Sequence, residues 1–342
     1  MLLLCTIQHK FNPAMKGLLM KQRAVLNIMV MLVALLTVPG RPLFAEDVKV
    51  ASSYLYTLSN FTGIYPVSSA VLGVDESQNE IYVVTSTKVK IFNTDGMEIY
   101  GFNEGGELGM VLDVAVDSKT ADIFVLASRA GQIELVRCNY RGEQMSTVEL
   151  KNLPPAFSGF TPNRLAVLDN SIYLASTNDM RVVVTDNVGM FKKGYDIASL
   201  ITEDLTEKEK EKEKQDAGLT GFSVDKQGNI LFTNGVIARA FKLSSDGQMR
   251  SFGMRGSTAG KFGIPGDIVA DATGNYILVA DTLRCVVMIF DNDFKFHAEF
   301  GNFGFKPSNL IGPMYVAIDG KNRLYVSQLR NRGVNVYQIT TS

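Results

Sequence analysis

The sequence GNYILVADT at residues 274–282 decides the fold, because versions of its central strand return along the whole chain. The six versions read IYVV at 81–84, IFVL at 123–126, IYLA at 172–175, ILFT at 230–233, ILVA at 277–280 and LYVS at 324–327. A period of roughly 45 residues built from short apolar strands is typical of a propeller, in which each repeat forms one four-stranded sheet. The sequence therefore predicts an all-β fold, a six-bladed β-propeller.

The two ends of the chain are expected to share one blade. The last repeat supplies only three strands, and an apolar run from Val50 to Asn60 precedes the first repeat. Pairing the first and last segments in one sheet removes open strand edges that invite aggregation. We therefore expect the N-terminal strand to close the ring, with a five-bladed or seven-bladed ring as the alternative.

Each repeat also carries recurrent turns. A first strand ends at or near an acid, a polar hairpin turn precedes the second strand, and several closing strands end in Phe-Gly. The clearest repeats run from Asp225 to Gly253 and from Asp271 to Gly301. These residues resemble the NHL-repeat family over about residues 66–337. The resemblance implies a six-bladed ring and a bacterial-type exported NHL-repeat protein.

The N-terminus reads as a secretory signal. Basic residues up to Arg23 precede an apolar stretch from Ala24 to Val38, and Leu43-Phe44-Ala45 then places the small residue Ala45 at the expected cleavage site. We predict a signal peptide and leader at 1–45 and a propeller at 46–342, exported to the periplasm or the extracellular space. An uncleaved membrane anchor is the alternative, but the stretch is short for a bilayer span, so we expect no transmembrane span in the mature chain.

Charge excludes one class of partner. The first 45 residues hold five Lys and Arg and no acid, so the remainder has 29 basic and 35 acidic residues, a net charge of −6. Nucleic-acid binding requires a basic face, and this composition does not indicate one.

Catalytic motifs are missing from the sequence. There is no GxSxG, HExxH, CxxCH or phosphate-binding loop. Propeller enzymes such as the amidating lyases and the streptogramin lyases use histidines, and only His297 follows the leader, at an expected exposed strand position. Calcium held by turn oxygens is the remaining alternative, with these candidates: Asn178, Asp179, Asn234 and Asp281. We expect no cofactor and, more generally, no catalysis.

A charged insertion at about 196–216 separates the third and fourth repeats. Ile197, Leu200, Ile201 and Leu205 fall at helical spacing, which predicts a short helix. A Glu-Lys alternation follows from Glu207 to Lys214. The insertion is either a solvated loop or an element that docks a partner.

Arginines recur in the loops between the second and third strands of the repeats. On a propeller these loops share one face with the links between blades, so we predict a binding face there. The candidate residues are Arg129, Arg181, Arg239, Arg284, Arg330 and Arg332. Guanidinium groups bind carboxylates and phosphates in a forked geometry, although the family resemblance implies that some of these arginines pair with acids of neighbouring blades.

Two hypotheses about function follow. The first is an exported, non-catalytic binding or scaffold propeller that engages a protein or glycan through its loop face, as a component of an envelope assembly. The second is a propeller enzyme, either a metal-dependent lactonase-like hydrolase or a lyase. The missing motifs favour the first hypothesis.

Overall fold

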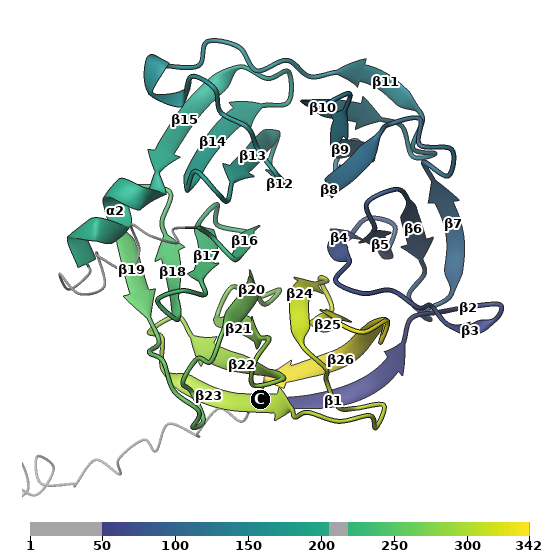
Figure 1. The fold of residues 1–342 in the computed structure, drawn as a ribbon, viewed down its shortest axis with the longest axis vertical. Coiled ribbons are helices and arrows are strands. Elements are labelled where there is room, and N and C mark those ends of the chain that lie inside the picture. Colours follow the sequence, from purple (N-terminus) through teal and green to yellow (C-terminus); the bar gives the residue numbers. More distant parts are fainter. Residues whose placement is uncertain (1–49, 205–217, 342) are drawn as a thin grey trace, which may run out of the picture. The chain divides into compact units, whose positions relative to one another are not determined.

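The computed structural model describes residues 50–204 and 218–341. Within them, six four-stranded sheets stand around a central axis, as Figure 1 shows. The six-bladed β-propeller that the repeat spacing predicts is confirmed. Neighbouring strands pair antiparallel in every blade, from the innermost strand outward.

The first three blades follow the chain in order. Blade 1 contains β4 (Val71–Asp75), β5 (Glu80–Val84), β6 (Val89–Phe92) and β7 (Glu98–Phe102). Blade 2 contains β8 (Met110–Asp117), β9 (Asp122–Arg129), β10 (Gln132–Cys138) and β11 (Gln144–Thr147). Blade 3 contains β12 (Arg164–Leu168), β13 (Ser171–Ser176), β14 (Arg181–Asp186) and β15 (Phe191–Asp196), and a short 3₁₀ turn, η1 (Pro155–Phe157), precedes it.

The last three blades complete the ring. Blade 4 contains β16 (Gly221–Val224), β17 (Ile230–Asn234), β18 (Arg239–Leu243) and β19 (Met249–Phe252). Blade 5 contains β20 (Pro265–Ala270), β21 (Tyr276–Asp281), β22 (Val286–Asp291) and β23 (Phe296–Gly301). Blade 6 contains β24 (Pro313–Ile318), β25 (Arg323–Gln328), β26 (Val334–Thr341) and β1 (Val50–Thr57).

Blade 6 confirms the predicted closure of the ring. β1 pairs with β26 from Val50 opposite Thr341 to Thr57 opposite Asn335. Tyr54 packs edge-on against Tyr337, with 5.8 Å between the ring centroids. A small hairpin, β2 (Ser59–Asn60) and β3 (Gly63–Ile64), then leads the chain into blade 1.

Burial follows from the radial stacking of the blades. The second strand of each blade is covered on both sides by neighbouring blades, so its residues are apolar without alternation. In β9, for example, Ile123 to Ala127 are almost completely buried. This continuous burial explains why the second strands are the part of the repeat that the sequence displays most clearly.

Two faces of the ring differ in what they carry. The loop face holds the links between blades and the loops between second and third strands. The turn face holds the remaining turns, which join first to second strands and third to fourth strands. The first turn of blade 3 is a two-residue turn between the register partners Leu168 and Ser171, and its residues Asp169 and Asn170 both adopt left-handed backbone angles, with φ of 46° and 59°.

The link between blades 3 and 4 contains the predicted helix, α2 (Ile197–Asp204). Ile197 and Ile201 are fully buried against blades 3 and 4, while Leu200 is partly buried. Leu205 and the Glu-Lys tract lie outside the described residues, as does the predicted signal peptide. No helix in residues 50–204 or 218–341 is long and apolar enough to cross a bilayer.

The pairing of β1 with β26 leads to a test of ring closure. A chain that begins at Leu58 leaves the edge of β26 unpaired, whereas a chain that begins at Lys49 retains β1. We expect the shorter chain to melt at a temperature lower by about 10 °C, since several kcal/mol of pairing and packing are lost. Differential scanning calorimetry measures this difference, and equal melting temperatures would contradict closure by β1.

Candidate functional site

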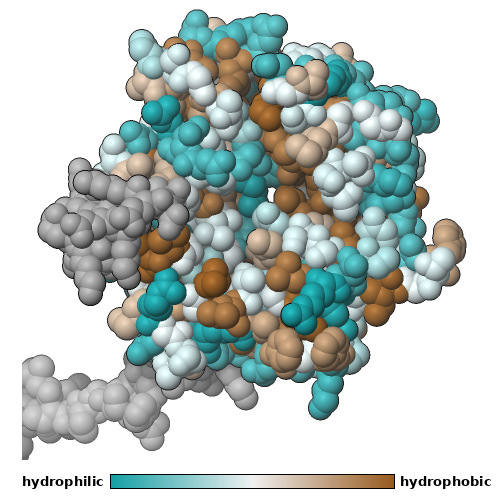
Figure 2. Space-filling view, in the orientation of Figure 1, coloured by the Kyte–Doolittle hydropathy of each residue, from teal (hydrophilic) through white to brown (hydrophobic). Residues whose placement is uncertain are grey.

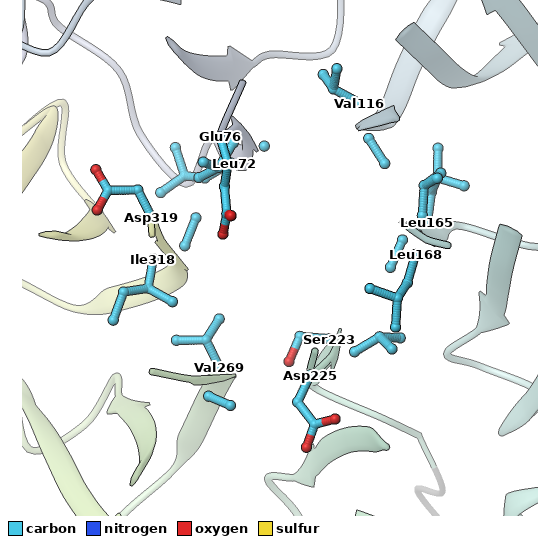
Figure 3. A pocket seen from close by; sticks show the side chains of 18 of the residues that line it. Leu72, Glu76, Val116, Leu165, Leu168, Ser223, Asp225, Val269, Ile318 and Asp319 are labelled. Atoms are coloured by element: carbon cyan, nitrogen blue, oxygen red, sulfur yellow. The ribbon is translucent and has the colours of Figure 1, made fainter. Parts of the chain in front are cut away.

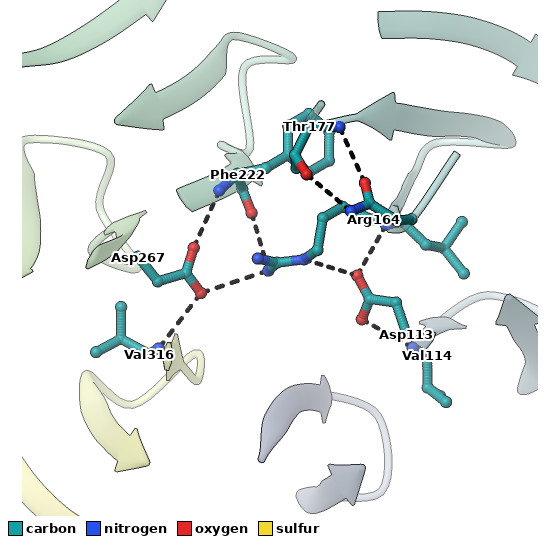
Figure 4. Close-up of polar contacts among 9 residues, drawn as sticks. Asp113, Val114, Arg164, Thr177, Phe222, Asp267 and Val316 are labelled. Carbon is teal, nitrogen blue, oxygen red and sulfur yellow. Dashed lines mark hydrogen bonds and ion pairs between the residues drawn. The ribbon is translucent and has the colours of Figure 1, made fainter. Parts of the chain in front are cut away.

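The centre of the ring is crossed by a buried ion cluster that the sequence analysis did not predict. Asp113 is the fourth residue of β8, Arg164 is the first residue of β12, and Asp267 lies in β20. The Nε atom of Arg164 donates to Oδ2 of Asp113 at 3.0 Å, and its Nη2 lies 3.4 Å from Oδ2 of Asp267 (Figure 4). We call these three residues the channel cluster.

Backbone groups complete the channel cluster. The two oxygens of Asp113 also accept from the backbone amides of Leu165 at 2.8 Å and Val114 at 2.8 Å. Asp267 accepts from the backbone amides of Phe222 at 3.0 Å and Val316 at 3.4 Å. The cluster therefore joins blades 2 to 6 through one guanidinium group and its two carboxylate partners.

The sequence places these side chains at equivalent positions of the repeat. Each lies opposite or beside the last residue of the four-residue run that recurs in the second strand of its blade. In register, Asp113 faces Leu126, the end of IFVL, and Arg164 faces Ala175, the end of IYLA. The same position holds Val71, Gly221 and Tyr315 in blades 1, 4 and 6. Two Asp-x-x-x-Asp runs, 113–117 and 267–271, were the signal available in the sequence.

Two of these equivalent residues make room for the cluster. A Cβ atom on Gly221 would lie 2.6 Å from Cα of Asp267, so a larger residue would push blade 5 away from blade 4. The ring of Tyr315 lies under the guanidinium of Arg164, with 5.3 Å from Cζ to the ring centroid. The cation is thus enclosed by two carboxylates and one aromatic face.

Burial dominates the electrostatics of the channel cluster. It raises the pKa of Asp113 and of Asp267, and Arg164 opposes this only in part. Burial also disfavours the charged form of Arg164, but the two carboxylates outweigh this and the pKa of the guanidinium is raised. Arg164 therefore stays charged at every pH at which the protein is folded.

Below the channel cluster the channel widens into a cavity of about 480 Å³. Its wall consists largely of small and apolar residues of the inner strands, including Leu72, Val116 and Val269 (Figure 3). At the turn face Nζ of Lys226 lies 3.1 Å from Oε1 of Glu76. This ion pair joins blades 4 and 1, so it spans the mouth of the cavity.

The predicted arginines lie on the loop face, and four of them belong to separate blades. Arg129, Arg181, Arg239 and Arg284 belong to four successive blades, from blade 2 to blade 5. Arg284 forms an ion pair with Glu299 of its own blade, with Nη2 2.6 Å from Oε1, and so stabilises blade 5. Arg129 and Arg239 also form hydrogen bonds within the protein.

Those two contacts are local. Nη2 of Arg129 donates to the carbonyl of Glu107 at 2.7 Å, and Nη1 of Arg239 donates to Ser251 Oγ at 3.1 Å. Arg181 begins β14 opposite Asp196 of β15. These positions describe a ring of separate arginines around the loop face.

Arg330 and Arg332 are the pair that the structure brings together, in the hairpin between β25 and β26. Arg330 is exposed, with a left-handed φ of 58°. Arg332 stacks over Phe305, with 5.8 Å from Cζ to the ring centroid, and donates to the carbonyl of Phe305 at 3.4 Å. Arg332 is thus linked to an exposed aromatic residue, Phe305, which the sequence analysis did not single out.

Candidate metal and catalytic groups have other partners. Asp281, one of the oxygen candidates for calcium, accepts from the backbone amides of Gly263 at 2.6 Å and Arg284 at 2.9 Å. Across residues 50–204 and 218–341, no three His, Cys, Asp or Glu side chains are grouped as metal ligands. His297 lies on the outer strand β23, 2.8 Å from Asp291, and is half-buried rather than exposed as expected.

Comparisons with known proteins support the fold. No protein-family model matches the chain, so membership of the NHL-repeat family stays a prediction. No curated protein matches it either. Solved structures do match, but at sequence identities that show the fold alone.

Three solved structures illustrate the similarity. A streptogramin B lyase is 12% identical, with 85% of this chain and 98% of that chain covered and a TM-score of 0.54. A protein of unknown function from Bacteroides thetaiotaomicron is 12% identical, with 85% and 77% covered and a TM-score of 0.58. A catalytically inactive virginiamycin B lyase from Staphylococcus aureus, with quinupristin, is 10% identical, with 86% and 100% covered and a TM-score of 0.53.

The raised pKa values in the channel cluster predict a pH dependence. The folded protein holds protons on Asp113 and Asp267 more readily than the unfolded chain does, whose Asp pKa is about 4. The contribution of these carboxyls to stability is therefore complete below about pH 4 and is lost as the pH rises through their raised pKa values.

The variant D267N removes one of the two titrating groups. We expect its free energy of unfolding to fall less steeply than that of the wild type between about pH 4 and pH 7, by at most about 1.4 kcal/mol per pH unit. Urea unfolding at each pH measures both curves. Parallel curves would show that Asp267 does not titrate as described.

Proposed function

We propose that this protein is a non-catalytic binding propeller that engages a partner protein through its loop face. The observation that carries the proposal is a group of large apolar side chains exposed on the loops of blades 4 to 6. Their exposed fractions are 61% for Met254, 64% for Leu283, 63% for Phe303 and 69% for Phe305. Together with Arg330 and Arg332 we call them the loop-face patch.

The loops that carry the loop-face patch are fastened to one another. The amide of Thr282 donates to the carbonyl of Ile264 at 3.0 Å, and the amide of Asn302 donates to the carbonyl of Cys285 at 2.9 Å. Phe303 and Phe305 stand edge to face, with 6.4 Å between the ring centroids. The patch is therefore presented on an ordered framework, which lowers the entropy lost on binding.

The chemistry of the loop-face patch suits a protein partner. Single exposed apolar residues are ordinary, but neighbouring ones on linked loops mark interaction sites. Aromatic rings, methionine and arginine are enriched at the centres of protein interfaces, where they contribute most of the affinity. In Figure 2 brown side chains lie among polar ones in the lower half of the view, where Figure 1 places blades 4 to 6.

The site geometry supports binding over catalysis. The polar groups of the channel cluster are engaged with one another and with backbone amides, which leaves them poorly suited to act on a substrate. His297, the histidine of the described residues, lies on an outer strand and not at the channel. The proposal retains the exported location and the envelope assembly that the sequence analysis predicts.

The loop-face patch can be tested by removing two rings. We expect the double variant F303A/F305A to fold as the wild type does, because both side chains are largely exposed. It should recover the partner at least about tenfold less efficiently in affinity capture after cross-linking in the native cells, since central aromatic residues dominate interface affinity.

The matched control is F61A. Phe61 is 97% exposed at the tip of the β2–β3 hairpin, outside the loop-face patch, and its removal should leave partner recovery unchanged. Equal recovery by F303A/F305A and the wild type would overturn the proposed docking surface. Turnover of lactone or ester substrates by the purified protein would favour the enzyme hypothesis.

A further inference from the structure

A second cavity lies between blades 1 and 2, at the turn face, and the loop-face patch does not include it. Its volume is about 520 Å³. The floor comes from blade 1, where Tyr82, Ile91 and Tyr100 are register partners on β5, β6 and β7. The opposite lip comes from the β10–β11 turn of blade 2, which contributes Tyr140. We call this cavity the blade 1–2 cleft.

Two carboxyl groups line the blade 1–2 cleft. Asp75 ends β4 and pairs in register with Glu80, the first residue of β5. Neither carboxyl has an ion-pair partner in the described part of the chain, whereas the hydroxyl of Tyr82 donates to Glu80 at 3.4 Å. Burial, and next the charge of Asp75, raises the pKa of Glu80, as expected where no cation is close.

In two other blades the equivalent acid pairs with a cation. In blade 4 Oδ2 of Asp225, which follows the first strand, lies 3.3 Å from Nζ of Lys242. In blade 6 Oδ2 of Asp319 lies 2.6 Å from Nε of Arg323. In these two blades the acid at the end of the first strand thus pairs with a cation of the same blade, whereas Asp117 of blade 2 and Asp271 of blade 5 form no ion pair within the described residues.

Blade 1 lacks a cation at the register position that Arg137 takes in blade 2 and Lys242 takes in blade 4. Lys242 pairs with Leu231, the second residue of the recurrent run ILFT at 230–233. Ile91 pairs with Tyr82, the second residue of the equivalent run IYVV at 81–84. Ile91 therefore stands where blade 4 has its lysine. Ile91 is shorter than lysine and uncharged, so neither carboxyl has an ion-pair partner here, although Oδ1 of Asp75 accepts from the amide and the hydroxyl of Ser77 at 2.8 and 2.6 Å.

We propose that the blade 1–2 cleft binds a ligand that carries an ammonium or guanidinium group, which takes the place of the missing lysine. The carboxyl groups of Asp75 and Glu80 would hold the cation, and the tyrosine rings would cover its apolar part and attract its charge. Arg141 already stacks its guanidinium 5.3 Å from the ring centroid of Tyr140, so a cation is accommodated at this lip. The cavity size falls in the ordinary range for small-ligand sites.

Binding of a matched pair of probes tests the charge requirement. Phenethylammonium and 2-phenylethanol have similar shapes, but only the first is charged. We expect the full chain to bind phenethylammonium at least about fivefold more tightly, measured by NMR titration, and the preference to shrink with added salt. Equal affinity for the two probes, or no binding of phenethylammonium at millimolar concentration, would overturn the proposal.

Two variants locate the site. E80Q keeps the shape of the cleft and removes one charge, so it should weaken phenethylammonium binding by at least about fivefold. E149Q makes the same charge change at an exposed residue outside the cleft and should have no effect. Equal weakening by both variants would assign the binding to general charge attraction and overturn the site.

I91K supplies the missing cation within the chain. We expect the folded I91K protein to lose phenethylammonium binding, because a lysine there can pair with Asp75 as Lys242 pairs with Asp225, and its melting temperature to fall, because Ile91 is buried in the core. Retained binding by a folded I91K protein would overturn the proposal. Partner recovery through the loop-face patch should be unchanged in I91K, which separates this site from the proposed function.

Discussion

One guanidinium group at the centre of the ring holds five of the six blades in a fixed relation. Arg164 pairs with Asp113 and Asp267, and the carboxylate of Asp267 accepts backbone amides from two further inner strands, β16 and β24. In a propeller each blade contacts only its neighbours, so groups on the axis are the ones that can connect distant blades. Buried charges are poor sources of stability, but their loss leaves uncompensated partners, and they restrict which arrangements are allowed. We infer that the channel cluster fixes the register between blades.

This arrangement also determines where binding can occur. Because the polar groups of the channel cluster engage one another, the axis offers a partner little at the loop face. Residues that differ from their equivalents in the other blades then indicate where binding can occur. Phe303 is exposed in the link after blade 5, at the place that Arg255 takes in the link after blade 4, and Ile91 stands where blade 4 has a lysine. Comparison of repeats within one chain thus points to surfaces that a search for catalytic motifs does not find.

The sequence predicts the fold well and the sites poorly, for physical reasons. The second strands of the six blades are buried on both sides, so their apolar residues recur in the sequence. The closure by Val50–Thr57 could be predicted because the last repeat would otherwise leave an unpaired strand edge. The buried half of α2 was also readable from spacing. The channel cluster was not, because Asp113, Arg164 and Asp267 lie in three separate repeats and only the closed ring brings them together. Four of the loop arginines lie on separate blades, Arg330 and Arg332 share one hairpin, and local groups engage most of the six.

The account holds that Arg164 supports the ring and does not contact a partner. The most direct test is the variant R164M, measured both for its free energy of unfolding and, under conditions where it is folded, for partner recovery. We expect a loss of about 3–5 kcal/mol in stability, because two buried carboxylates lose their cation, and unchanged recovery by the folded protein. Unchanged stability together with lost partner recovery would contradict the account and would make the channel itself the binding site.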